Sequence, residues 1–464
     1  MEFHQFFLPC LAHASYLVGD DGVAAVVDPQ RDVEDYLEEA SRRGLTITHV
    51  IETHLHADFV SGHLELAERT GATIWVSHRA QATFDHQPVG DGDVLQLGQV
   101  ALEVLETPGH TPEGVCLLIR DDANLDAPHR LLTGDTLFIG DVGRPDLAGG
   151  VGFTSEDMAE MLYDTLHSRI ATLPDETELY PAHGAGSACG QKMSSELSST
   201  LGEQKRVNWA LQPMGKEDFI SALTTELDAP PSYFSRDAAM NREGAPSLES
   251  LEAPAPLDLD AFDQKRLEGA VVLDTRPAEE FTKGHVPKAL WVGLKGQFAS
   301  WCGSILPQNK PLLLIARDKE QLEETTLRLA RVGIDQIVGT LDGGMEAWRE
   351  AGKPVSALES VETQSLHQIL SRSGEMDVLD VRQSAEHRGG HVPGAAHLPL
   401  RELTSRLDEV PPSGSRAVIC ATGYRSLVAC SILLARGDEQ VVNVEGGTEG
   451  WKKQGFEVEA GKGP

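Results

Sequence analysis

The second half of the chain repeats itself, and this repeat constrains the fold more than any other feature of the sequence. Leu273–Arg276 is followed by Gly284–Pro287, and roughly 105 residues later Leu379–Arg382 is followed by Gly390–Pro393 at the same internal spacing. Each copy also closes on a similar segment, which is Asp342–Trp348 in the first and Glu445–Trp451 in the second. We therefore expect two tandem domains of one fold.

The repeat and the local composition together set the expected domain boundaries. A chain of 464 residues is too long for one core, and about 100–200 residues per domain suggests three domains. We place the two repeats at 258–356 and 359–464. Residues 241–257 are rich in Pro, Ala, Ser and Glu, which is typical of a linker. The remaining residues, 1–240, then form a large N-terminal domain.

Short apolar strands alternate with helical patterns along the whole chain. In the repeats we expect buried strands at 271–274, 312–315, 417–420 and 441–444. In the N-terminal domain we expect strands at 23–27, 73–76 and 94–105 and helices at 33–42 and 64–69. This alternation predicts an α/β multidomain protein with parallel sheets in the repeats.

The bulk composition excludes several classes of partner. A net charge of −33 argues against nucleic acid, because phosphates repel an acidic surface. No apolar run reaches the ~18–20 residues that span a bilayer, and the first residues lack a secretory leader. We therefore expect a cytoplasmic protein without a membrane partner. The six cysteines are too scattered for a disulfide framework, so a cysteine in a special loop is better interpreted as catalytic.

Histidines and acids recur in four loop-like segments of the N-terminal domain. His54, His56 and Asp58 follow a strand-like stretch at alternate positions, which lets their side chains share one side. His110, Asp135 and His183 lie in three later segments that each contain Gly or Pro after an apolar stretch. Imidazoles and carboxylates together are typical ligands of a first-row metal ion. The four segments predict a metal site.

These four segments, in this order, resemble the metallo-β-lactamase superfamily over residues 1–240, which implies an αβ/βα sandwich with the metal at one edge. Dinuclear hydrolases of that superfamily have a second histidine directly after the aspartate, and here that position is Phe59, which cannot bind a metal. The pattern is closer to the persulfide dioxygenase branch. That resemblance implies one Fe(II) per chain, held by His54, His110 and Asp135.

The same resemblance implies that His56, Asp58 and His183 surround this iron and orient its ligands or its bound waters. Arg144 lies in a segment that also resembles the branch, and it either supports the structure or faces an anionic substrate. We expect His63 to pack at the start of a helix rather than to touch the metal. Cys189 follows His183 in a glycine-rich stretch, and glycine lets a loop approach the metal closely. We interpret Cys189 as a catalytic thiol that holds sulfur.

A second chemical site lies in the last repeat. Cys420 ends a strand-like segment and begins the loop Ala421, Thr422, Gly423, Tyr424 and Arg425, after which a helical pattern runs to Arg436. Loop N–H groups and the helix dipole would stabilise a thiolate there, and Arg425 adds positive charge. The loop therefore predicts a cysteine that carries a persulfide.

With its Asp-Val-Arg and Gly-His-Val-Pro segments, this repeat resembles the rhodanese family of sulfurtransferases. The six-residue loop matches those enzymes, whereas related phosphatases have a loop one residue longer, so a phosphatase is the less favoured alternative. The first repeat has Ala316 where the cysteine would lie, and Cys302 precedes the strand. We expect residues 258–356 to form an inactive rhodanese-like domain.

Together these sites predict an enzyme that oxidises a low-molecular-weight thiol persulfide with O2 to sulfite and passes sulfane sulfur on to thiosulfate. The thiol carrier could be glutathione, coenzyme A or a similar thiol, and the reverse transfer from thiosulfate is also consistent with the sequence. The alternatives are a glyoxalase II-type dinuclear thioester hydrolase and a sulfur-carrier or sensing scaffold. The family resemblance also implies a homo-oligomer, either a dimer or a tetramer.

Overall fold

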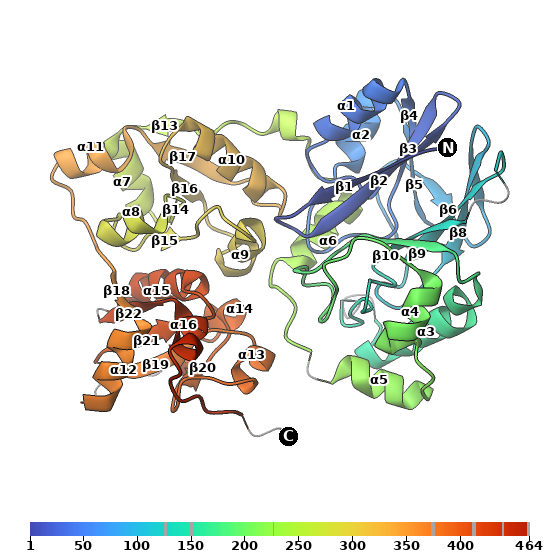
Figure 1. The fold of residues 1–464 in the computed structure, drawn as a ribbon. Coiled ribbons are helices and arrows are strands. Elements are labelled where there is room, and N and C mark those ends of the chain that lie inside the picture. The colour runs from blue at the N-terminus through green and yellow to red at the C-terminus, as the bar shows by residue number, and fades with distance from the viewer. Residues whose placement is uncertain are drawn as a thin grey trace. The chain divides into compact units, whose positions relative to one another are not determined.

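The computed structural model describes residues 1–124, 128–147, 152–225, 227–372, 376–410, 414–438 and 440–461. The chain forms two compact units (Figure 1). One contains residues 1–252 with 330–333, and the other contains residues 253–329 with 334–464.

The first unit is built on two six-stranded sheets. The first sheet has the order β1 (Glu2–Leu8), β2 (His13–Asp20), β3 (Val23–Val27), β4 (Thr46–Ile51), β5 (Thr73–Ser77) and β6 (Gln87–Val89). The second has the order β12 (Ser199–Thr200), β11 (Glu178–Pro181), β10 (Arg130–Gly134), β9 (Val115–Asp121), β8 (Val100–Glu106) and β7 (Val94–Leu97).

Side chains that alternate along each strand separate the layers of this unit. In the first sheet, Val18 and Val27 join a core shared with β7, β8 and β9 of the second sheet. Their neighbours Leu17 and Val26 pack instead against helices on the other side. Each sheet therefore has one face toward the other sheet and one toward helices, which is the expected αβ/βα sandwich.

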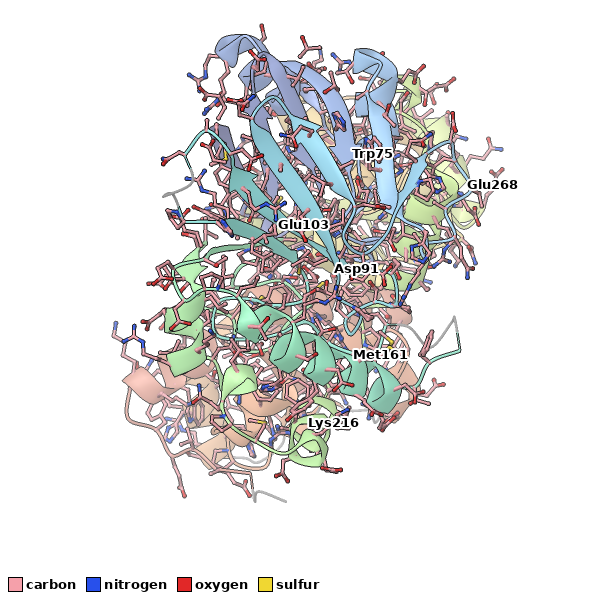
Figure 2. The ribbon with its side chains drawn as sticks, turned by 90° about the vertical axis from the view of Figure 1, so that its right-hand side faces the viewer. Trp75, Asp91, Glu103, Met161, Lys216 and Glu268 are labelled. Carbon is pink, nitrogen blue, oxygen red and sulfur yellow. The ribbon has the colours of Figure 1, made fainter. Side chains whose placement is uncertain are left out.

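The helices of the first unit cover these two outer faces (Figure 1). These are α1 (Glu34–Arg43) and α2 (His63–Thr70) on the first sheet, and α3 (Ser155–Ser168), α4 (Leu201–Val207) and α5 (Lys216–Thr224) on the second. The unit also contains α6 (Phe234–Glu243) and 3-10 turns at Ile170–Thr172, Trp209–Leu211 and Leu248–Ser250. Helix α5 lies along α3, and Lys216 at its start pairs with Glu160 and Asp164 of α3 (Figure 2). Helix α6 overlaps the first residues of the expected linker.

One expected strand is divided in the structure. The stretch 94–105 forms the antiparallel pair β7 and β8, and these strands are joined by a tight turn rather than forming one long strand. Gly98 makes the turn with a φ of +58°, a conformation that favours glycine. The even apolar pattern of both strands hid this turn. The strand expected at 23–27 has the expected bounds.

The second unit contains two five-stranded parallel sheets, one for each repeat. The first has the order β13 (Pro256–Leu257), β17 (Ile337–Leu341), β16 (Leu312–Ile315), β14 (Val271–Asp274) and β15 (Leu290–Trp291). The second has the corresponding order β18 (Glu359–Glu362), β22 (Val441–Glu445), β21 (Arg416–Ile419), β19 (Asp377–Asp380) and β20 (Ala396–His397). The repeated sequence therefore gives a repeated topology.

Helices cover both sheets of the second unit, and one apolar core joins the two repeats. The helices are α7 (Leu259–Leu267), α8 (Ala278–Lys283), α9 (Phe298–Ile305), α10 (Lys319–Ala330), α11 (Gly344–Glu350), α12 (Thr363–Arg372), α13 (Ser384–Arg388), α14 (Leu400–Leu403), α15 (Tyr424–Arg436) and α16 (Gly447–Lys453), with a 3-10 turn at Leu407–Glu409. Within the described ranges, no helix combines the length and the apolar character needed to cross a bilayer.

Candidate metal centre and sulfur-transfer loop

The metal-ligand candidates lie where strands of the first unit end. His54 follows β4, while His110, Asp135 and His183 follow β8, β10 and β11 of the other sheet. Each of the four side chains is almost completely buried. Loops that leave neighbouring strands at one edge of a sandwich converge there, so residues far apart in sequence form one cluster.

His54, His110 and Asp135 form a compact set of potential ligands. Their three ligand atoms all lie within 4.8 Å of one another. Nε2 of His110 lies 3.4 Å and Nε2 of His54 lies 3.8 Å from Oδ2 of Asp135. That buried oxygen has no hydrogen-bond partner among the described residues, so a bound cation would satisfy it. Two imidazoles and one carboxylate fit a divalent first-row ion such as Fe(II).

Each ligand is oriented by a hydrogen bond to its other polar atom. Nδ1 of His54 lies 3.0 Å from the hydroxyl of Thr53, and Nδ1 of His110 lies 2.9 Å from the carbonyl oxygen of Arg144. Gly143 lets that loop come close, because a Cβ there would lie 2.0 Å from the carbonyl oxygen of Asp135. The three ligand atoms therefore face one another before any ion binds.

The ionisation states also suit metal binding. Burial, followed by the charge of His56, holds the pKa of His54 well below its usual range, so its imidazole is neutral. Burial opposes ionisation of Asp135, but His183, then His54 and His110, hold the pKa of Asp135 well below its usual range. Neutral imidazole and ionised carboxylate are the forms that bind metals.

His183 lies between two carboxylates. Its Nδ1 is 2.7 Å from Oδ1 of Asp135, and its Nε2 is 2.9 Å from Oδ2 of Asp58. Burial opposes protonation, but Asp135 and Asp58 raise the pKa of His183 well above its usual range. The structure thus places His183 and Asp58 beside the ligand Asp135, where they fix its orientation.

The structure also brings Cys189 to this cluster. Its sulfur and the ligand atoms of Asp58 and His183 lie within 4.8 Å of one another. Burial, followed by the charges of Asp58 and Asp135, raises the pKa of the Cys189 thiol well above its usual range. Cys189 is therefore a protonated thiol in this environment, and its proton must leave before the sulfur can act as a nucleophile.

Arg144 has several partners within the protein. Its guanidinium binds both oxygens of Asp146, at 2.6 and 2.7 Å, and also the carbonyl oxygens of Ala188 and Asp228. Its backbone N–H donates to the carbonyl oxygen of Cys189 at 2.9 Å. Arg144 therefore fastens the loop that carries Cys189.

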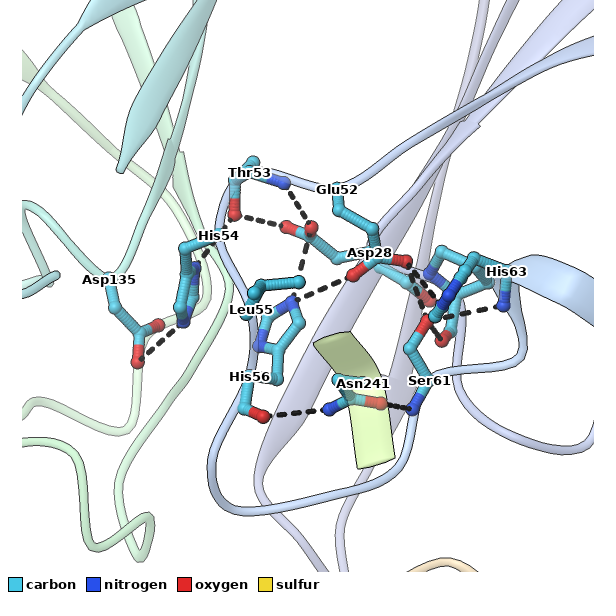
Figure 3. Close-up of polar contacts among 12 residues, drawn as sticks. Asp28, Glu52, Thr53, His54, Leu55, His56, Ser61, His63, Asp135 and Asn241 are labelled. Atoms are coloured by element: carbon cyan, nitrogen blue, oxygen red, sulfur yellow. Dashed lines mark hydrogen bonds and ion pairs between the residues drawn. The ribbon is translucent and has the colours of Figure 1, made fainter. Parts of the chain in front are cut away.

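His56 points away from Asp135 and into a second buried cluster (Figure 3). Its Nε2 lies 3.2 Å from Oδ1 of Asp28 and 3.7 Å from Oε2 of Glu52. Asp28 accepts hydrogen bonds from the N–H and the hydroxyl of Thr53, which in turn contacts His54. His56 is therefore connected to the ligand His54 through Asp28 and Thr53, and its Nε2 does not face the metal position.

Other residues of this region carry no local signal in the sequence. Asn241 on α6 donates to the carbonyl oxygens of His56 and Phe59, each at 2.7 Å, and accepts from the N–H of Ser61 at 2.8 Å (Figure 3). The Tyr233 hydroxyl donates to the carbonyl oxygen of Asp58. These contacts hold the ligand loop from a segment about 180 residues further along the chain, and only the fold reveals them.

In the last repeat, the loop around Cys420 has the expected form of strand, tight turn and helix. The N–H of Gly423 points at the Cys420 sulfur at 3.1 Å, and the hydroxyl of Ser426 lies 3.4 Å from it. Gly423 has a φ of +114°, which a residue with a side chain rarely adopts. Helix α15 starts at Tyr424, so its first turn lies directly after this loop.

Arg425 and Tyr424 of this loop have partners of their own. The Arg425 guanidinium binds both carboxylate oxygens of Glu386, at 2.6 and 2.7 Å. The Tyr424 hydroxyl donates to the carbonyl oxygen of Gly293 in the first repeat at 2.7 Å. Arg425 is thus held in place by an acid, and the Tyr424 side chain is directed toward the first repeat rather than toward Cys420.

The first repeat places Ala316 where Cys420 lies in the second. Cys302 is buried in α9, and burial raises the pKa of its thiol well above the usual range. Neither residue provides a reactive sulfur in this repeat.

Comparisons with known proteins match one family to the first unit and another to each repeat of the second unit. Residues 8–183 match the model of the metallo-beta-lactamase superfamily, and residues 259–351 and 362–454 each match the rhodanese-like domain. A crystal structure of a metallo-beta-lactamase from Staphylococcus aureus is 32% identical, covers 74% of this chain and 98% of its own, and superposes with a TM-score of 0.65. The chain belongs to the metallo-β-lactamase superfamily and continues into two rhodanese-like domains.

The curated relatives point further within that superfamily. The bovine mitochondrial persulfide dioxygenase ETHE1 is 34% identical over 187 residues, which is 39% of this chain and 66% of the bovine protein. A hydroxyacylglutathione hydrolase of Erythrobacter litoralis is 33% identical over 187 residues and 67% of its length. The chain therefore spans about two thirds of these relatives. Its domains fit a metallo-β-lactamase-fold persulfide dioxygenase fused to rhodanese domains.

Proposed function

We propose that this protein oxidises low-molecular-weight thiol persulfides with O2 at one Fe(II) per chain and passes sulfane sulfur to sulfite at Cys420. One observation carries this proposal. The same chain combines a buried set of two histidines and one aspartate with an intact rhodanese loop around a cysteine. The similarity to persulfide dioxygenases and to rhodanese-like domains supports an enzyme that requires a metal and acts on sulfur compounds.

In the oxidative step, one persulfide, one O2 and one water give one thiol and one sulfite, with two protons released. Fe(II), held by His54, His110 and Asp135, would supply open positions for O2 and for a substrate sulfur. The protein itself keeps Asp135 ionised and directed by His183. The buried surroundings exclude bulk water, which protects the persulfide from side reactions.

Cys189 adds a thiol beside that metal position. A persulfide that meets its sulfur can exchange, so that the outer sulfur moves to Cys189 and the carrier thiol leaves. Because Asp58 and Asp135 disfavour a second negative charge there, the thiol has to lose its proton as the sulfur arrives. We propose that Cys189 holds sulfane sulfur during oxidation, and replacing it with serine should slow oxygen uptake more than it slows sulfur transfer.

In the transfer step, the Cys420 thiolate takes the outer sulfur of a second persulfide and releases the carrier thiol. Sulfite then attacks that sulfur, which gives thiosulfate and returns the thiolate. The N–H of Gly423 lies where it can stabilise negative charge on the cysteine sulfur, while the hydroxyl of Ser426, 3.4 Å from that sulfur, donates to Oδ1 of Asn443 at 2.6 Å. Both steps share sulfite, so joining them in one chain raises its effective concentration.

A thioester hydrolase is the competing assignment, because hydroxyacylglutathione hydrolases match the chain about as well as persulfide dioxygenases do. Phe59 argues against it, since this buried ring occupies the position of the histidine that helps bind a second ion in dinuclear hydrolases. Hydrolysis of S-lactoylglutathione by the zinc- or iron-loaded protein would favour the hydrolase.

Oxygen uptake tests the proposal. Anaerobically iron-loaded protein would receive glutathione persulfide or coenzyme A persulfide, and sulfite and thiosulfate would be measured for the wild type and for Cys420→Ser. We expect uptake from both proteins, with thiosulfate from the wild type and sulfite accumulating in the variant. No uptake with either persulfide would remove the dioxygenase assignment.

A further inference from the structure

The buried cluster behind the ligand loop has no role in the proposed reaction. It brings together Asp28 at the end of β3, Glu52 at the end of β4, and His56 and His63 from the following loop and α2. The four side chains are between 0 and 1% exposed. Figure 3 shows them gathered on the side of the loop opposite Asp135. A buried group of this composition is stable only when protons on its side chains or a bound cation balance the negative charge of its carboxylates.

The spacing of these groups is compatible with that of metal ligands. One atom each from Asp28, Glu52 and His56 lies within 4.8 Å of the others. The His56 Nε2 separations from the two carboxylates are 3.2 and 3.7 Å. A tetrahedral ion with bonds of about 2.0–2.1 Å separates its ligand atoms by about 3.3–3.5 Å. N–H···O hydrogen bonds are about 2.7–3.2 Å long, so the separation from Asp28 also fits a hydrogen bond, whereas the separation from Glu52 is too long for one.

Two other buried clusters of this unit, around His54 and around His183, allow these nitrogen–oxygen separations to be compared. His54, His110 and Asp135, which the family resemblance assigns to iron, show separations of 3.4 and 3.8 Å. The contacts of His183 with its two aspartates are 2.7 and 2.9 Å, which leaves a proton, not an ion, between them. By this measure the Asp28 cluster resembles the metal site and differs from the His183 cluster.

Unpartnered imidazole nitrogens point to a missing ligand. Both ring nitrogens of His56 and both of His63 are buried, and none has a hydrogen-bond partner among the residues that the structure describes. Buried polar atoms without partners are rare in native proteins, and each calls for water, an ion or another explanation. Here His56 Nε2 faces two carboxylates, which favours a cation between the three groups.

We propose that Asp28, Glu52 and His56 hold a second divalent first-row transition-metal ion, such as Zn2+ or Mn2+, which is separate from the iron position. Two carboxylates and a neutral imidazole give the site a charge of about −2 and a donor set that such ions accept. This position is also distinct from the one that Phe59 leaves without a histidine, which lies with Asp58 and His183.

This ion would have a structural role. It would join the ends of β3 and β4 to the loop that carries His54, and Asp28 already contacts Thr53, which orients His54. Its removal is therefore expected to lower the melting temperature and to weaken ion binding at the iron position. The protein would acquire the ion as it folds, because the site is buried.

Metal counting on the full chain tests this site without relying on enzyme activity. Metal-free protein would be reconstituted with Co2+ or Zn2+, passed through a desalting column and measured by native mass spectrometry and by elemental analysis. We expect two ions per chain for the wild type, one for Glu52→Gln, one for His110→Ala and none for the double variant. Ser61→Ala removes a hydrogen bond to Glu52 without removing a ligand, so it should keep two ions.

The same variants distinguish this site from a protein with one metal ion and from a dinuclear hydrolase site. One ion in the wild type, or an unchanged ion count in Glu52→Gln, would overturn the proposal. Loss of the second ion in Asp58→Asn but not in Glu52→Gln would place it at a dinuclear hydrolase site instead. Circular dichroism shows whether Glu52→Gln folds. If it does not, the visible spectrum of Co2+ bound to His110→Ala tests the proposal instead. Nitrogen and oxygen ligands at a closed site give intense d–d bands, whereas an empty site gives none.

Discussion

The two rhodanese-like repeats share their strand order and several side-chain contacts, and they differ in the loop that carries the cysteine. In each, an arginine binds the aspartate two residues before it: Arg276 Nε lies 3.0 Å from Asp274, and Arg382 Nε lies 3.0 Å from Asp380. In each, the closing tryptophan donates to a carbonyl six residues later, at 2.8 and 2.7 Å. The first repeat keeps these contacts without a reactive cysteine, so the fold does not depend on the sulfur loop.

Where the two repeats have different residues at a matching position, the same backbone contact can be kept. Trp291 Nε1 donates to the carbonyl oxygen of Arg276 at 2.8 Å, and at the matching position His397 Nε2 lies 2.8 Å from that of Arg382. Glu280 and Glu386 also match, but only Glu386 has a loop arginine to bind. Glu280 is 42% exposed, and its carboxylate lies 3.8 Å from the Arg276 guanidinium. The comparison shows which residues serve the fold and which serve the loop.

The largest effect is expected when the loop of the second repeat loses its nucleophile. Cys420→Ser should lower thiosulfate formation from persulfide and sulfite by at least about 10³-fold, because a hydroxyl cannot carry sulfane sulfur. Cys302→Ser in the first repeat is the matched control and should leave the rate unchanged. A cyanide- or sulfite-dependent sulfurtransferase assay measures both, and comparable losses in the two variants would contradict the assignment of roles.

A pair of glycines tests how closely each loop packs. Gly447 and Gly344 have similar φ values of +54° and +57°, so alanine strains both backbones alike. A Cβ at Gly447 would lie 2.4 Å from the carbonyl oxygens of Cys420 and Ala421, whereas one at Gly344 would approach Ala316 O only to 4.0 Å. Gly447→Ala should therefore cost about 2–3 kcal/mol more than Gly344→Ala, measured by urea unfolding, and only Gly447→Ala should reduce sulfur transfer.

Glu386 tests whether the position of the loop arginine matters. Glu386→Gln removes one charge from the ion pair, which should free Arg425 and lower kcat for sulfur transfer about 10-fold with a smaller change in KM. Glu280→Gln, at the matching position of the first repeat, should change neither constant. An unchanged or higher kcat in Glu386→Gln would show that Glu386 only restrains the arginine and does not help to place it for the reaction.

A stacked histidine adds a pH dependence to the second repeat at a position where the first repeat has phenylalanine. His387 stacks on His391 with ring centres 3.6 Å apart, where the first repeat stacks Phe281 on His285 at 3.9 Å. Burial, followed by His397 and His391, lowers the pKa of His387 to about 4. The unfolded chain therefore binds this proton first as the pH falls, and stability is lost between pH 6.5 and about 4.

Replacing this histidine by the residue of the first repeat should remove that loss. His387→Phe should reduce the drop in melting temperature between pH 7.5 and 5.5 by about 2–4 °C. Calorimetry on the full chain measures this, and Phe281→His is the reciprocal variant, which should enlarge the drop. Equal pH dependence in the wild type and His387→Phe would mean that other groups control acid unfolding.

The sequence predicted the repeated fold and the sulfur loop because their signals are local. Cys420, Gly423 and Arg425 lie within six residues, and each repeat carries its own markers. The metal region was harder, since His54 and His110 follow recognisable strands but Asn241 contacts the ligand loop across 185 residues. The direction of the His56 ring was also hidden, because it depends on Asp28 and Glu52 at the ends of two different strands. Contacts that depend on strand ends meeting in space leave no pattern along the chain.

The smallest expected effect concerns returning a cysteine to the first repeat. In a Cys420→Ser background, Ala316→Cys should restore less than about 1% of the transfer rate, although it places a thiol at the matching strand end. Helix α10 begins three residues after Ala316, whereas α15 begins four residues after Cys420. The first repeat is therefore one residue short of a loop that can surround a sulfur.

The remaining loop groups of the first repeat are also occupied. The N–H of Arg317 donates to the Gln321 side chain at 2.6 Å, and Asp318 accepts from the N–H of Gln321 at 2.8 Å. An introduced thiolate would find these N–H groups used and an acid beside it, so its pKa should not fall. Alkylation with iodoacetamide across pH would show whether the thiol is accessible and at what pH it reacts. Restored transfer with a low pH midpoint would show that a cysteine alone separates the two repeats.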